Sequence, residues 1–262
     1  MVDVFREVRR VLRDDGTLWL NLGDSYINNP ASAVNCNGMD GSLNDGKTEF
    51  DCRVATRGSQ QRKTIPSGLK VKDLAGIPWR VAFALQVDGW YLRSDIIWHK
   101  PNPMPESVTD RPTKAHEYLF LLSKCAKYWY DHEAIAEPLA TKAHAPGNKA
   151  SGRLGHNGKT DNCVHQPDRI WGASGTRNRR TVWTVESAPY KGAHFATFPP
   201  KLIRPCILAG CPAGGTVLDP FGGSGTTGEV AEMEGRNSIL VELNPEYVTL
   251  AKKRTAQMGL FT

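Results

Sequence analysis

The sequence predicts an α/β fold in which a mostly parallel β-sheet carries helices on both faces. Residues 217–219, Val-Leu-Asp, form a short apolar run that ends in an acid, and a glycine-rich turn and a helical stretch follow directly. A second apolar run, 238–241, ends at Glu242. Near the start of the chain, the nearly all-apolar run 17–22 is typical of a strand buried on both faces of a parallel sheet.

The elements expected before this turn follow in chain order. Apolar residues at helical spacing predict a first helix over 2–12 with one apolar face; they are Val4, Phe5, Val8, Val11 and Leu12. After the turn at 14–16 and the strand 17–22, a second helix is expected over 74–87, with Pro78 in its first turns. Strands are expected at 91–98, 118–123 and 128–131, and a third helix at 198–209.

Two segments differ in composition from the rest. Residues 27–72 are rich in Asn, Gly, Ser and Asp and hold few large apolar groups, which predicts a basic, flexible insertion. In residues 132–189 Gly, Asn, His and basic residues dominate. We therefore expect one domain made of 1–131 and 190–262, interrupted by a separate region at 132–189.

Length and composition bound the class of protein. A chain of 262 residues fits a single large α/β domain with a sizeable core. The mean hydropathy is −0.42 and no apolar run reaches about 18 residues, so no membrane span is expected. The chain shows no basic-then-apolar leader, and its six cysteines form no C-x-x-C pair. We therefore expect a cytoplasmic protein with reduced thiols and no metal site.

The net charge of +6 is concentrated in two segments. Residues 142–181 hold eight Lys or Arg and two Asp or Glu, and residues 53–72 hold six Lys or Arg and no acid. Each segment carries +6, so the remainder of the chain carries −6. Basic loops on an acidic scaffold indicate binding of a polyanion such as nucleic acid. The alternative is a pair of solvated surface loops.

The glycine-rich turn indicates a ligand site. Glycines let the backbone approach a ligand closely, and the following helix presents its N-terminal N–H groups. Glu242, at the tip of the next strand, suits an acid that binds ribose hydroxyls. The turn does not read G-x-G-x-x-G, and no Lys follows it as in a P-loop. The alternative is an ordinary strand–helix turn without a ligand.

Residues 219–228, DPFGGSGTTG, closely resemble the S-adenosylmethionine loop of the DNA amino-methyltransferases, which methylate adenine-N6 or cytosine-N4. The resemblance covers nearly the whole chain, in the permuted order that puts the cofactor loop near the C-terminal end. Other segments that resemble this family are 15–26, 95–103, 111–123 and 194–202. The resemblance implies a Rossmann-like methyltransferase fold, S-adenosyl-L-methionine as cofactor, and methyl transfer to a base flipped out of double-stranded DNA.

The resemblance also implies a set of cofactor-binding residues. Asp219 would border the methionine end, Glu242 would bind the ribose, and Thr226 or Thr227 would cap the helix. The whole set is Asp219, Phe221, Gly222, Gly223, Ser224, Gly225, Thr226, Thr227, Glu242, His194 and Phe198. For Phe198, plain core packing is the alternative.

Residues 132–189 correspond in the resemblance to a target-recognition region. Its sharpest feature is the run Arg177, Asn178, Arg179 and Arg180. Arg can bind guanine and Asn can bind adenine in the major groove, although phosphate contacts are more frequent for Arg. We expect this run to bind DNA; an RNA or small-molecule methyltransferase is the weaker alternative.

One family motif is absent from residues 1–262. The catalytic Asp, Asn or Ser followed by Pro-Pro and an aromatic does not occur, and the single Pro-Pro pair, 199–200, precedes Lys201. In the family this motif ends a strand that lies between the counterparts of 17–22 and 216–219. We therefore expect the sheet to lack one central strand.

The absent motif leaves the catalytic residues unassigned. Asp24, with Tyr26, is a weak candidate because it ends a strand near the expected base pocket, and a turn or helix cap is its alternative role. Three interpretations remain open. An upstream piece is missing from this sequence, a homodimer partner or another chain supplies the strand, or the chain is a DNA- and cofactor-binding module that is inactive alone.

Overall fold

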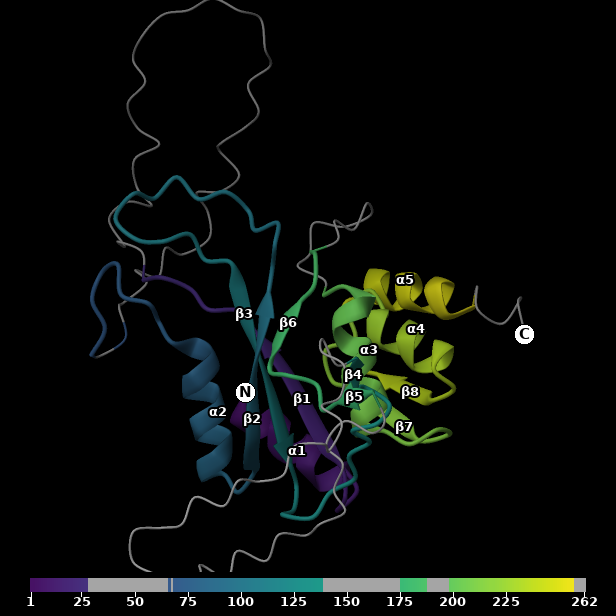
Figure 1. Cartoon of the computed structure of the whole chain (residues 1–262). Coiled ribbons are helices and arrows are strands. Elements are labelled where there is room, and N and C mark those ends of the chain that lie inside the picture. The colour runs from purple at the N-terminus through teal and green to yellow at the C-terminus, as the bar shows by residue number, and fades with distance from the viewer. Residues whose placement is uncertain (28–65, 67, 139–174, 188–197, 257–262) are drawn as a thin grey trace, which may run out of the picture.

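The structure is a computed structural model that describes residues 1–27, 66, 68–138, 175–187 and 198–256. Helices lie on both sides of the main strands, and the fold is Rossmann-like α/β as predicted (Figure 1). The elements are α1 (Val2–Val11), β1 (Thr17–Leu22), α2 (Ile77–Val87), β2 (Tyr91–His99), β3 (His116–Ser123), β4 (Glu137–Pro138), β5 (Thr176–Arg177), β6 (Val182–Thr184), α3 (Pro200–Gly210), β7 (Thr216–Asp219), α4 (Thr226–Met233), β8 (Asn237–Leu240) and α5 (Pro245–Ala256).

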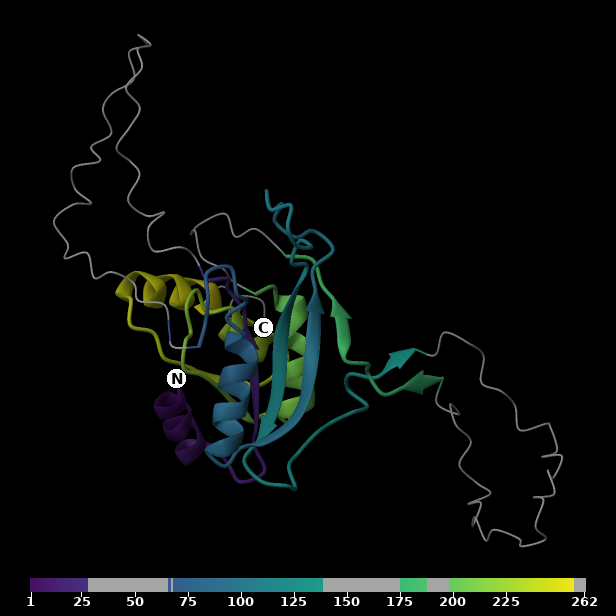
Figure 2. The same ribbon diagram turned by 90° about the vertical axis from the view of Figure 1, so that its left-hand side faces the viewer.

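The strands form three hydrogen-bonded groups. Four strands pair in the order β1-β3-β2-β6, and β7 pairs with β8 in parallel. β3 is antiparallel to both of its neighbours, whereas β2 and β6 are parallel, so β3 alone runs against the other three strands of its group. β4 and β5 form a short antiparallel ribbon that stands away from the sheet (Figure 2).

Side chains alternate between the two faces of the sheet along each strand. Apolar side chains therefore lie on both faces of the four-stranded group, and helices cover both. Leu20 of β1 and Phe120 of β3 lie in one core cluster with Phe5 of α1. On the other face, Trp19 packs against a second cluster that contains Leu202 of α3. Burying each of these large apolar side chains contributes about 1.5–3 kcal/mol to folding.

β7 lies in the same layer as β1, yet the two strands are not paired. Leu218 packs against the α1–α2 cluster, as Leu20 of β1 does, and Val217 packs against the cluster formed by α3 and α4. Among the described strands, β1 is paired with β3 alone and β7 with β8 alone. The expected gap in the middle of the sheet is therefore present, and we call it the β1–β7 slot.

Two contacts join elements on either side of the slot. Near the start of β1, the Thr17 hydroxyl donates to the Gly210 carbonyl, 3.4 Å away, at the end of the helix that leads into β7. Just past the end of β7, the Phe221 ring meets the Phe5 ring edge-on, with 6.4 Å between centroids. These contacts join β1 to the end of α3 and α1 to the loop after β7. Only Leu20 is buried in either strand, so the expectation that 17–22 is a strand buried on both faces is wrong. An unpaired edge leaves neighbouring side chains open to water.

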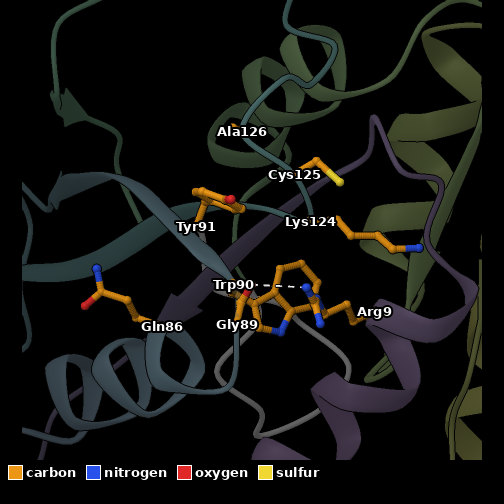
Figure 3. Close-up of a pocket in the computed structure, with 8 residues that line it drawn as sticks. All are labelled: Arg9, Gln86, Gly89, Trp90, Tyr91, Lys124, Cys125 and Ala126. Atoms are coloured by element: carbon orange, nitrogen blue, oxygen red, sulfur yellow. Dashed lines mark hydrogen bonds between the residues drawn. The ribbon is translucent and has the colours of Figure 1, made fainter.

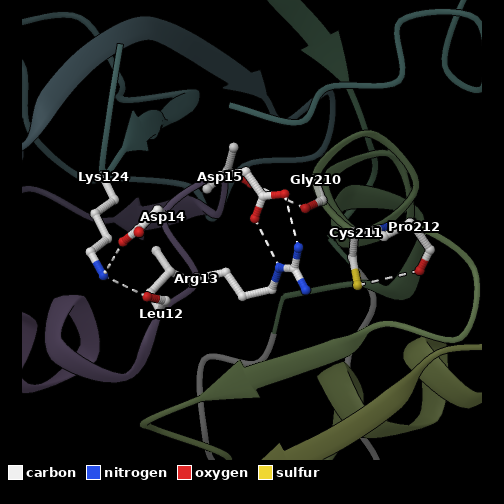
Figure 4. Close-up of polar contacts among 9 residues, drawn as sticks. Leu12, Arg13, Asp14, Asp15, Lys124, Gly210, Cys211 and Pro212 are labelled. Atoms are coloured by element: carbon white, nitrogen blue, oxygen red, sulfur yellow. Dashed lines mark hydrogen bonds and ion pairs between the residues drawn. The ribbon is translucent and has the colours of Figure 1, made fainter. Parts of the chain in front are cut away.

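Other expectations also need correction. The segment 128–131 is a loop and not a strand, because Trp129 donates to Asp15 and Asp131 to Ala209 instead of pairing in a ladder. Val4 and Val11 are exposed, so the apolar face of α1 is narrower than expected. Neither β6 nor α5 was predicted from the sequence. Charged contacts hold the turn before β1, where Arg13 binds Asp15 and Lys124 binds Asp14 (Figure 4).

No helix in the described part of the chain is long and apolar enough to cross a membrane. The described residues also contain no group of three or more His, Cys, Asp or Glu side chains placed to hold a metal ion.

Candidate functional site

The glycine loop lies at the carboxyl ends of β7 and β8, which is where open parallel sheets bind ligands. Asp219 is the last residue of β7, and Glu242 follows β8 by two residues. Residues 220–225 connect β7 to α4 between these two acids. The structure therefore brings together the two acids and the loop that the sequence predicted as one site.

Asp219 holds the loop at both of its ends. Its Oδ1 accepts a hydrogen bond from the Phe221 N–H at 2.9 Å, and its Oδ2 accepts one from the Thr227 hydroxyl at 2.5 Å. The helix α4 begins after Gly225 and has no side-chain cap, so the expected capping role of Thr226 or Thr227 is wrong. The Thr227 hydroxyl is drawn to the nearby carboxylate instead.

Glu242 is held by backbone N–H groups. Its Oε1 accepts from Asn244 and its Oε2 accepts from Gly223, each at 2.8 Å. The hydrogen bond from Asn244, together with that from Gly223, lowers the pKa of the Glu242 carboxyl. Glu242 is therefore an anion at neutral pH that is aimed at the glycine loop. An ionised carboxylate has about four acceptor positions, so it can bind a ligand hydroxyl as well.

Two positions in the loop require glycine. A Cβ on Gly222 would lie 2.9 Å from the Leu240 Cβ. Gly225 has a φ of +84°, and a Cβ there would lie 2.8 Å from the Cα of Ala251 in α5. The loop therefore packs directly on β8 and α5. The sequence predicted the loop but not the helix behind it, although Asn244-Pro245-Glu246 is a helix-start pattern.

Apolar side chains surround the two acids. Phe221 and Val241 are about half exposed, and Leu243, next to Glu242, is 98% exposed. Exposed large apolar groups beside charged ones are typical of binding sites that orient a ligand through a few polar contacts. The residues present fit S-adenosylmethionine, whose ammonium group and ribose hydroxyls match the two acids and whose adenine ring matches the apolar rim.

The remaining described candidates have contacts of their own. Phe198 packs against the cluster on the α3 face, which is the core-packing alternative. His194 lies outside the described residues. The Oδ1 of Asp24 accepts from the backbone N–H of Ser25 and of Ile77, so it caps the start of α2. Tyr26 lies beneath the Arg111 guanidinium, 3.7 Å from ring centroid to Cζ.

The arginine run lies on and after β5. Arg180 and Arg177 both approach the Oε2 of Glu137, with Nε–Oε2 distances of 3.0 and 3.4 Å. Burial acts to raise the pKa of Glu137, but the hydrogen bond from Arg180 and the nearby charges outweigh it and the pKa is lowered. Arg179 lies over the Trp183 ring, 4.6 Å from Cζ to centroid. Residues 53–65 and 142–174 of the basic segments lie outside the described residues.

A cavity of about 480 Å³ lies at the opposite end of the sheet, where β2 begins and β3 ends (Figure 3). Arg9, Trp90, Tyr91 and Lys124 are among the residues that line it. It is separate from the glycine loop, which follows the carboxyl end of β7.

The family model described as DNA methylase, N6_N4_Mtase, matches residues 1–253. The Type II methyltransferase M.Cfr9I of Citrobacter freundii is 50% identical over 254 residues, which cover 97% of this chain and 69% of that protein. Among solved structures, the cytosine-N4-specific PvuII DNA methyltransferase shares the fold with a TM-score of 0.59 at 20% identity, covering 97% of this chain and 70% of that one.

A second solved structure, a putative DNA modification methylase from Thermus thermophilus complexed with S-adenosyl-L-methionine, has a TM-score of 0.51 at 20% identity. It covers 98% of this chain and 74% of that one. The whole-length family match and the 50% identical relative carry the assignment, and the two structures support the fold. The chain therefore belongs to the N6_N4_Mtase family of S-adenosylmethionine-dependent DNA methyltransferases.

Proposed function

We propose that the loop between Asp219 and Glu242 binds S-adenosylmethionine for methylation of an exocyclic amine of adenine or cytosine in double-stranded DNA. The observation that carries the proposal is the placement of these two acids on either side of a glycine loop at the carboxyl ends of β7 and β8. Three described cysteines are free thiols, which fits a reducing compartment such as the cytoplasm.

Each part of the cofactor has a matching group in this site. Asp219 attracts the ammonium group of the methionine end, and Glu242 accepts from the ribose hydroxyls. The backbone from Phe221 to Thr227 surrounds the cofactor, and Leu243 contacts the adenine ring. When bound, the cofactor supplies an electrophilic methyl group on a sulfonium. This chain's contribution is to hold that methyl in line with the acceptor amine.

Residues 132–189 form the target-recognition region in this proposal, and 1–131 with 190–262 form the catalytic domain. β6 lies within the recognition region and pairs with β2 of the catalytic domain, so it joins the two. Arg177, Arg179 and Arg180 contact DNA, and the exposed Arg180 is the most accessible to phosphate. Asn178 lies within the same run.

A second candidate function is favoured by the β1–β7 slot. The carboxylate of Asp24 caps α2, so no described residue is assigned as acceptor for the target amine. We infer that residues 1–262 alone bind cofactor and DNA but transfer methyl groups negligibly. Methylation then needs one more strand in the slot, from residues outside 1–262 or from a different partner chain, which brings the catalytic residues.

Titration calorimetry with S-adenosylmethionine tests the cofactor assignment. Asp219→Ala and Glu242→Ala should each weaken binding by about tenfold or more, because each removes hydrogen bonds between the ligand and a charged group. Asp14→Ala is the matched control, since Asp14 lies in the turn before β1 and pairs with Lys124. Absence of binding by folded wild-type protein at millimolar cofactor would refute the assignment.

Radiolabelled methyl transfer to DNA separates the two functions. The pure chain should bind cofactor and leave DNA unlabelled. Labelling at the rate of a complete enzyme, with no added polypeptide, would show that other residues of 1–262 replace the absent motif.

A further inference from the structure

Arg254, in the last turn of α5, contacts the end of the glycine loop and the start of α4. Its Nη1 lies 2.9 Å from the Thr226 Oγ1 and 3.3 Å from the Ser224 Oγ, and donates to both hydroxyls. Its Nε forms an ion pair with the Oε2 of Glu229 at 2.6 Å. The Arg254 side chain is only 19% exposed. One guanidinium therefore joins α5 to the loop and to α4.

The two hydroxyls that Arg254 contacts are buried. Ser224 and Thr226 are 8% and 5% exposed, and they belong to the few polar side chains buried in the described part of the chain. A buried hydroxyl without a hydrogen-bond partner is unfavourable, because it has lost its hydrogen bonds to water. Arg254 satisfies both with donors in a fixed planar arrangement, which a flexible Lys would not reproduce.

A steric contact acts at the residue between these two. Gly225 packs against Ala251, one turn before Arg254 in α5, closely enough to exclude any Cβ. Three consecutive loop residues, 224–226, are therefore fixed by one helix. The segment leading into α5 also holds Glu242, through the N–H of Asn244. The segment just before α5 therefore contacts Glu242, and the later turns of α5 contact residues 224–226.

We propose that Arg254 is a positioning residue for the S-adenosylmethionine loop, acting through Ser224 and Thr226. This inference rests on the proposed cofactor site. A loop that binds through its backbone N–H groups needs those groups held in place before the ligand arrives, because otherwise binding must order them. Arg254 provides that order from outside the ligand site.

The test compares substitutions in α5. Arg254→Met should raise the calorimetric Kd for S-adenosylmethionine by about tenfold, and Arg254→Lys should raise it by a smaller factor. Lys253→Met is the matched control, because Lys253 is the exposed neighbour in the same helix and loses the same charge. Backbone hydrogen exchange over 222–227 should quicken in Arg254→Met and stay unchanged in the control.

Glu229→Gln separates positioning from stability. This change removes the ion pair but leaves the contacts from Arg254 to the two hydroxyls. If Arg254 only stabilises the fold, Glu229→Gln and Arg254→Lys should both lower the urea midpoint and leave the Kd unchanged. If Arg254 positions the loop, Arg254→Lys alone should raise the Kd.

The outcomes distinguish this inference from the cofactor assignment. Failure of the wild-type chain to bind S-adenosylmethionine would refute the cofactor assignment itself. Wild-type binding with an equal Kd in Arg254→Met or Arg254→Lys would overturn only the role of Arg254. If Arg254→Met does not fold, Ser224→Ala replaces it, and combined with Arg254→Lys it should weaken binding less than the sum of the two single effects.

Discussion

Asp219 and Thr227 join the two ends of the glycine loop: the Thr227 hydroxyl donates to Oδ2 of Asp219 across 2.5 Å. The other carboxylate oxygen, Oδ1, accepts from the Phe221 N–H. A single carboxylate therefore binds the first turn of α4 and the start of the loop. This arrangement gives Asp219 a structural role in addition to its proposed contact with the cofactor.

Thr227→Val should weaken cofactor binding while keeping the shape of the side chain. Losing one hydrogen bond to a carboxylate costs about 1.5 kcal/mol or more, which corresponds to about tenfold in Kd. Thr249→Val is a matched control, because the Thr249 hydroxyl donates to the Pro245 carbonyl within α5. Calorimetry on both variants checks this; equal Kd values would show that the Asp219–Thr227 bond does not shape the site.

Glu242 should make both stability and cofactor affinity depend on pH in the acidic range. Hydrogen bonds from Asn244 and Gly223 lower its pKa in the folded chain below the ordinary value of about 4.3. Its contribution is therefore fully present above the unfolded-state pKa and is lost as the pH falls through the folded-state pKa.

Urea unfolding of wild type and Glu242→Gln from neutral to acid pH measures this. The difference in stability should be constant near neutrality and shrink as the pH falls below the ordinary Glu range. A difference that grew on acidification would mean that the Glu242 pKa is raised in the folded chain.

Arg180→Gln should weaken binding to double-stranded DNA and lower its salt dependence. Each lost phosphate contact reduces the slope of log K against log salt by about 1. Arg204→Gln is the control, because Arg204 is similarly exposed, 59% against 69%, and is also paired with a Glu, but lies on α3. Fluorescence anisotropy over a salt series gives both slopes. Identical slopes for wild type and Arg180→Gln would remove Arg180 from the DNA interface.

The β1–β7 slot should be visible in hydrogen exchange. β3 is paired on both edges, whereas β1 is paired on one, so alternate β1 amides have no partner across the slot. We expect those amides to exchange much faster than the amides of β3. A polypeptide that fills the slot should protect them and leave the outer edge of β8 unchanged. Slow exchange along the whole of β1 in the isolated chain would contradict an open slot.

The parts of the site that the sequence predicted are those encoded by a local pattern. The acid, the glycine turn and the acid after the next strand lie within 24 residues, so their proximity follows from one strand–helix–strand unit. α5 went unpredicted because Pro245 to Ala256 has little separation of polar and apolar residues, and its role depends on the contact between Ala251 and Gly225. No local pattern encodes that contact.

The sequence by itself determined the fold class, the β7–α4 loop with its two acids, and the absence of the catalytic motif within residues 1–262. Only the tertiary structure decided how β3 runs against its neighbours, that Asp24 caps α2, and that Arg254 supports the loop from α5. Arg254 and Thr226 are 28 positions apart, Asp24 and Ile77 are 53 apart, and the Asn21 side chain of β1 and the Tyr118 carbonyl of β3 are 97 apart. The packing of helices on both faces of the sheet brings these residues together, and no periodicity along the chain encodes their contacts.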